Sequence, residues 1–136
     1  MTTTLDHAPA TRTWGLAFAV WACGLAAFQL ALALGAPWGE AAWGGQTEGV
    51  LPAGLRVGSA VSTVVWLGVA AIAAGRLLGP TGRRRTLLGV TIYSAAGIAL
   101  NALSPSATER AIWVPGTVLG TALAWMAWRE ARAARP

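Results

Sequence analysis

Long apolar stretches alternate with short polar segments along the chain, and the central part of each stretch contains no Asp, Glu, Lys, Arg or His. An α-helix rises 1.5 Å per residue, so about 20 apolar residues cross the hydrocarbon core of a bilayer. The pattern therefore predicts an all-α membrane protein, a single domain formed by a four-transmembrane-helix bundle. The predicted helices cover residues 14–36, 55–78, 86–103 and 112–128.

The connection between the first two predicted helices, residues 37–54, is rich in glycine and tryptophan. It holds Trp38 and Trp43 with Glu40 between them. Tryptophan favours the headgroup region, where its ring is buried and its N–H stays hydrated. We therefore expect a short interfacial helix from Pro37 to Trp43, lying in the outer membrane interface.

Arginine positions predict the orientation, because short cytoplasmic flanks retain Lys and Arg. With both termini in the cytoplasm, the tails 1–13 and 129–136 and the turn near residue 80 carry eight arginines, and the outer side carries two. The inner set is Arg12, Arg76, Arg83, Arg84, Arg85, Arg129, Arg132 and Arg135, and the outer set is Arg56 and Arg110. The chain is therefore predicted to be a multi-pass protein of the bacterial cytoplasmic membrane, N-in and C-in.

A cleavable signal peptide is the alternative interpretation of the first stretch, since Ala31-Leu32-Ala33 resembles a signal-peptidase site. The apolar run is longer than a signal peptide's apolar region, and Arg12 is the only cation before it. Both features favour a retained helix.

The composition excludes several classes of function. The chain is 55% hydrophobic and 11% charged, with a mean hydropathy of +0.55. Its arginines flank apolar stretches, so nucleic acid is not expected as a partner. One cysteine, Cys23, and one histidine, His7, leave no disulfide, no haem ligand and no metal-ligand set. We expect no metal and no cofactor.

The chain also lacks the membrane-embedded acidic residue that proton-coupled transport usually needs. The chain matches the small multidrug exporters in length and helix count, and those proteins depend on a membrane-embedded Glu in their first helix. The first predicted helix here offers only Gln29. No ionisable group is available at membrane depth to carry a proton.

Polar side chains gather in the predicted outer half of the helices. Arg56, Ser59, Thr63 and Trp66 follow helical spacing, and Gln29, Asn101, Thr117 and Thr121 lie at similar depth. One interpretation is a ligand or partner site, a shallow hollow roofed by Trp38 and Trp43, in which Arg56 meets an anionic or polar headgroup. The other is that these groups bond between helices or to their own carbonyls. In that case Arg56 either extends to the outer headgroups or pairs with Glu40 or Glu48, and the pairing with Glu40 is favoured. Trp21 and Trp66 are interpreted as packing residues and Trp113 as an interface residue.

Small residues mark a predicted packing face on the second helix. Gly54, Gly58 and Ser62 recur every four residues, a spacing that allows helix backbones to approach closely. This face predicts contact with a neighbouring helix, with a second copy of the chain or with another membrane protein. With 17 glycines in the chain, one such match is weak.

The sequence ALALGAPWGEAAWGG followed by LPAGLR resembles the first outer loop of small four-helix bacterial membrane proteins of unknown function. The resemblance covers residues 28–62 and implies four spans but no activity. No catalytic motif occurs, so an enzyme is not expected. The leading hypothesis is a non-enzymatic binding or partner-interaction protein in the lipid bilayer with an outward-facing Trp-rich site. The alternative is a homo-oligomeric small-molecule transporter or channel subunit.

Overall fold

The computed structural model describes residues 12–134, and within that range the regular secondary structure is all helical, with no strand. The predictions for residues 1–11, including His7, and for Arg135 fall outside the described residues. Three of the helices, α1, α2 and α4, are long and apolar enough to cross a membrane. The elements are α1 Thr13–Leu34, the 3₁₀ turn η1 Gly39–Ala41, α2 Ala53–Ala73, α3 Pro80–Ala102 and α4 Ala107–Ala133.

The helix bounds differ from the apolar stretches that predicted them. α2 ends at Ala73 instead of residue 78, because Gly75 at φ +72° turns the chain out of the helix. α3 begins at Pro80 instead of 86, since proline is tolerated in a first turn. Apolarity marks the part of a helix that contacts lipid, whereas caps and turns decide where the helix itself begins and ends.

The last helix and the long loop also differ from expectation. α4 runs from 107 to 133 instead of 112 to 128, because Ser106 caps its first turn by accepting the Glu109 backbone N–H at 3.1 Å. Between α1 and α2, the three-residue turn η1 stands where a longer helix over 37–43 was expected.

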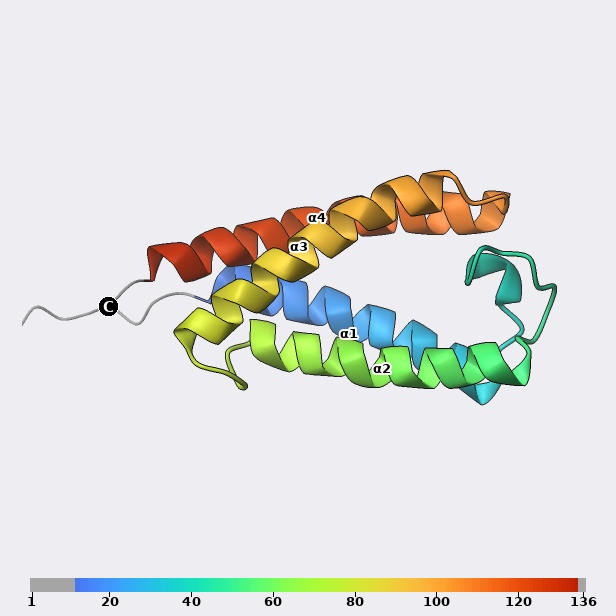
Figure 1. Ribbon diagram of the computed structural model, residues 1–136, viewed down its shortest axis with the longest axis horizontal. Coiled ribbons are helices and arrows are strands. Elements are labelled where there is room, and N and C mark those ends of the chain that lie inside the picture. The colour runs from blue at the N-terminus through green and yellow to red at the C-terminus, as the bar shows by residue number, and fades with distance from the viewer. Residues whose placement is uncertain (1–11, 135–136) are drawn as a thin grey trace, which may run out of the picture.

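The helices form two antiparallel pairs, α1 with α2 and α3 with α4 (Figure 1). The pairs are joined mainly through α1 and α4, whereas α2 and α3 share few contacts and diverge away from their connecting turn. We call the end that holds residues 35–52 and the α3–α4 turn the loop end. The opposite end, with the start of α1, the α2–α3 turn and the end of α4, is the arginine end.

Small side chains build the core where the pairs meet. Phe18 and Leu87 are fully buried among alanines, of which Ala22, Ala73 and Ala124 have no exposed surface. Alanine lets helix backbones approach closely, which drives packing where lipid removes the hydrophobic effect between helices. The outward faces carry large apolar side chains, such as Val20 at 74% exposure. A lipid environment accounts for such a surface.

The arginine end is held together by buried charges on helix termini. The Glu130 carboxylate accepts the backbone N–H groups of Trp14 at 3.1 Å and Gly15 at 3.0 Å. Arg83 donates from Nε and Nη2 to the carbonyl of Ala73, at 3.0 and 2.9 Å. Its Nη2 lies 3.7 Å from Glu130 Oε2. These contacts satisfy the free N–H groups that begin α1 and a carbonyl that ends α2, so all four helices are joined here.

Candidate functional site

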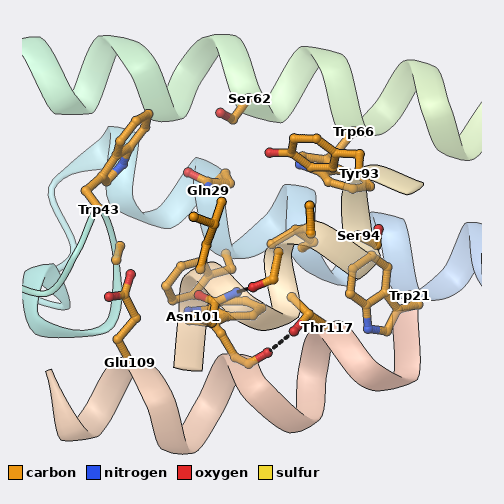
Figure 2. A pocket seen from close by; sticks show the side chains of 17 residues that line it. Trp21, Gln29, Trp43, Ser62, Trp66, Tyr93, Ser94, Asn101, Glu109 and Thr117 are labelled. Atoms are coloured by element: carbon orange, nitrogen blue, oxygen red, sulfur yellow. Dashed lines mark hydrogen bonds between the residues drawn. The ribbon is translucent and has the colours of Figure 1, made fainter. Parts of the chain in front are cut away.

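A cavity of about 330 Å³ lies between the two helix pairs, on the side of the loop end. Its lining comes from all four α-helices and from the loop (Figure 2). Tyr93 and Leu100 line it and yet are 68% and 71% exposed. The cavity therefore opens to the surface beside α3, where α2 and α3 separate.

Aromatic rings form much of the cavity wall. Trp21 of α1 meets Trp66 of α2 edge to face, with ring centroids 5.7 Å apart, and Trp66 lies 6.3 Å from Tyr93 of α3. Nearer the loop, Phe28 and Trp113 meet edge to face at 4.8 Å. Edge-to-face pairs are favourable for aromatic quadrupoles, so the wall is ordered by its own packing.

The loop is attached to α4 across the loop end of the cavity. The Glu109 carboxylate accepts the Gly44 backbone N–H at 3.0 Å and the Ser104 hydroxyl. Ser106 Oγ donates to the Glu40 carbonyl at 2.6 Å, and Trp113 Nε1 donates to the Ala41 carbonyl at 2.6 Å. Residues 40–44 are thus fixed to the first turns of the last helix.

Trp43 attaches the same loop to α2. Its Nε1 donates to Ser59 Oγ at 3.0 Å, and its ring lies over Gly58, where a Cβ would come within 3.0 Å of the indole. Trp43 itself has a positive φ of 55°, followed by Gly44 at 85°. This left-handed backbone turns the indole back onto α2. The loop consequently bridges the two helix pairs where the helices themselves diverge.

Two polar atoms at the cavity have no hydrogen-bond partner among residues 12–134, namely Gln29 Oε1 and Ser94 Oγ. Ser94 is only 3% exposed. Other polar side chains of these helices bond to carbonyls four residues earlier, as Thr91 Oγ1 does to Leu87 and Asn101 Nδ2 to Gly97, both at 2.8 Å. Both atoms are buried within the wall itself, where a polar group without a partner is destabilising by about 1–3 kcal/mol.

The cavity gathers only some of the residues expected to form the outer site. Gln29, Trp43, Asn101 and Thr117 line it, together with Ser62 and Trp66. Trp38 instead stacks on Phe28 at 5.9 Å and does not line the cavity. Glu40 contributes its backbone carbonyl to the bond with Ser106.

The expected pairing of Arg56 with Glu40 is wrong. Arg56 Nε donates to the Ala33 carbonyl at 3.0 Å, and among the described residues it forms no ion pair with Glu40. The reason is that α1 ends beside it with free carbonyls, which attract a cation. Arg56 therefore stabilises a helix end and is not among the cavity residues.

Ser59 and Thr63 are buried on α2 and do not line the cavity. Ser59 is fully buried and accepts from Trp43, and Thr63 Oγ1 donates to the Ser59 carbonyl at 2.9 Å. The spacing placed them on one face with Trp66, which does line the cavity, but their own hydroxyls bond to Trp43 and to a carbonyl of α2.

The small-residue face of α2 meets no neighbouring helix at its first two positions. A Cβ at Gly54 would have no atom within 4 Å, and one at Gly58 would meet Trp43 first. Within the described chain, Gly58 makes room for an indole ring, and Ser62 lines the cavity. Association of this face with a second copy stays a prediction.

Several cavity residues were not expected from the sequence. Trp21 and Trp66 were interpreted as packing residues, and Glu109 was not among the residues expected to form the site. The signal for Glu109 was present, because Ser106-x-x-Glu109 has the spacing of a helix capping box. No sequence signal distinguishes Ser94 from the other small polar residues of its helix.

Among residues 12–134, no three His, Cys, Asp or Glu side chains come together in a way that could hold a metal ion. Comparison of the chain with protein-family models, with curated proteins and with solved structures gives no match.

Proposed function

We propose that this protein is a non-enzymatic, four-span protein of the bacterial cytoplasmic membrane that binds an amphipathic small molecule in the cavity between its helix pairs. α3 is the fourth span, crossing with its apolar part after Arg85. Both termini lie in the cytoplasm, and the cavity is in the outer half of the bilayer.

Arginine distribution supports this orientation. Seven described arginines lie at the arginine end or close to it: Arg12, Arg76, Arg83, Arg84, Arg85, Arg129 and Arg132. The two at the loop end both donate to backbone carbonyls, Arg56 to Ala33 and Arg110 to Ser104. Since cytoplasmic flanks are the arginine-rich ones, the loop end faces outward.

The observation that carries the binding proposal is a built cavity with polar side chains in its wall. Its volume is within the range of small-molecule pockets, about 300–1,000 Å³. Its walls are mostly apolar and include a few polar side chains, among them Gln29, Asn101 and Thr117. An amphipathic molecule reaches it from the lipid between α2 and α3, with its polar group inside and its apolar chain outward.

Filling the cavity tests the proposal. Ser62→Trp places a large ring into the cavity from α2, whereas Ala60→Trp, on the same helix, adds the same ring at an exposed position outside the cavity lining. Native mass spectrometry of protein extracted from membranes in mild detergent measures which small molecules remain bound. We expect a discrete bound mass on the wild type and on Ala60→Trp, and at least a tenfold lower occupancy on Ser62→Trp. Equal occupancy of all three proteins would contradict ligand binding in this cavity.

A further inference from the structure

The described residues that line the cavity include a single acidic side chain and no arginine. The acid is Glu109. It is only 6% exposed, and no described cation lies within ion-pair distance of its carboxylate. Arg110, its neighbour in sequence, donates instead to the Ser104 carbonyl at 2.6 Å. The negative charge of Glu109 is therefore balanced only by hydrogen-bond donors and by the first turn of α4.

The other lining groups are also electron-rich. Gln29 contributes a neutral amide, and the walls include the rings of Trp21, Trp66 and Tyr93. Aromatic faces attract cations, most strongly where water is excluded. The described lining thus combines one carboxylate at the loop end with an aromatic wall farther from the loop, and holds no arginine.

A charged ligand must find its complement inside the cavity, because burying an unpaired ion is strongly unfavourable. A phosphate group here would meet the Glu109 carboxylate and no arginine, so the lining disfavours anionic lipids. A positive charge would be attracted by the same carboxylate. Figure 2 shows Glu109 and Trp43 at the loop end of the cavity, with Trp21, Trp66 and Tyr93 farther from the loop.

We propose that the molecule bound in this cavity is a lipophilic ammonium cation. The positive nitrogen lies near Glu109 at the loop end, and the apolar chain runs along the aromatic part of the wall and leaves the cavity between α2 and α3. The inference rests on the proposed function and adds the chemical class of the ligand to it.

Dodecyltrimethylammonium is a suitable probe, with dodecanol as its uncharged counterpart and dodecyl sulfate as the anion. Binding is measured by equilibrium dialysis of radiolabelled probe against protein in nanodiscs, with empty nanodiscs of the same lipid as the blank. We expect saturable binding of the cation, at least tenfold tighter than that of either other probe.

Glu109→Gln separates a binding role from a structural one. Glutamine still accepts the Gly44 N–H and can still bond to Ser104, so the loop stays attached while the charge is removed. We expect affinity for the cation to fall at least tenfold and affinity for dodecanol to stay the same. The control is Glu48→Gln, which removes an exposed acid of the same loop and should leave both affinities unchanged.

Trp66→Leu provides a second variant, because it changes the apolar wall far from Glu109 and leaves the carboxylate in place. It should change the affinities for the cation and for dodecanol by the same factor. Cation binding that is equal in wild type and Glu109→Gln would overturn the inference, as would tighter binding of dodecyl sulfate. If the wild type shows no cation binding but retains a molecule that Ser62→Trp loses, the ligand class is wrong and the proposed function stands. If the wild type shows neither cation binding nor a retained molecule, the ligand class and the proposed function are both wrong.

Discussion

At the scale of single residues, two helix glycines show how differently the same residue type can be used. A Cβ at Gly120 of α4 would lie 2.4 Å from the Trp21 ring, whereas a Cβ at Gly89 of α3 would meet no atom within 4 Å. Gly120 therefore provides the space in which Trp21 lies, and Trp21 in turn forms part of the cavity wall. Gly89 has no such role.

Gly120→Ala is expected to lower the free energy of unfolding by about 1–3 kcal/mol, the usual effect of overpacking. Gly89→Ala should leave it unchanged or raise it by up to about 1 kcal/mol, because alanine favours the helix. Titration with sodium dodecyl sulfate in mixed micelles, followed by circular dichroism, measures both. Equal effects of the two substitutions would show that Trp21 does not pack on Gly120.

The contacts made by single residues were the hardest feature to predict from the sequence. Spacing placed Ser59 and Thr63 on one face of α2 but could not tell that the face is buried. Arg56 and Glu40 have opposite charges and lie close in sequence, yet Arg56 bonds to the end of α1. The partner of such an arginine depends on which helix end lies beside it, and the packing of the helices decides this.

At the scale of helices, the apolar stretches predicted which segments are helical but not their ends. The sequence predicted four helices and the structure has four, of which α1, α2 and α4 meet the length and apolarity of a membrane span. The helix pairs are joined at opposite ends by different means. Buried charges join them at the arginine end, and the loop bridges them at the other.

Arg83→Gln tests the junction at the arginine end. Arg83 and Glu130 have side-chain exposures of 11% and 12%, and removing one partner of a buried pair usually costs about 3–5 kcal/mol. The 3.7 Å separation is longer than a hydrogen bond, so we expect a loss of about 2–3 kcal/mol in the same unfolding titration.

The control for that substitution is Arg85→Gln, which removes an exposed arginine two residues away and should change the free energy of unfolding by less than about 0.5 kcal/mol. If Arg83→Gln lowers the free energy of unfolding no more than its control does, the Arg83–Glu130 junction does not stabilise the fold. The close packing at the arginine end is then due to the alanine-rich core alone.

At the scale of the whole molecule, the two helix pairs meet along α1 and α4 and separate between α2 and α3 (Figure 1). The sequence predicted an outward-facing hollow with Gln29, Trp43 and Asn101 in it, and these three do line the cavity. It did not predict that the cavity lies between helix pairs, or that Glu109 faces it. Both depend on contacts between residues more than sixty positions apart, such as Glu109 with Gly44.

The most direct test of ligand binding is photo-crosslinking in living cells. A diazirine-bearing amino acid is placed at Ser62, in the cavity, or at Ala60, an exposed position outside the lining, and the adducts are weighed by mass spectrometry after irradiation. We predict a discrete adduct mass at position 62 that differs from those of the bulk phospholipids, and only bulk phospholipids at position 60. The same phospholipid adducts at both positions would contradict the account, because the cavity would then be ordinary lipid-facing surface.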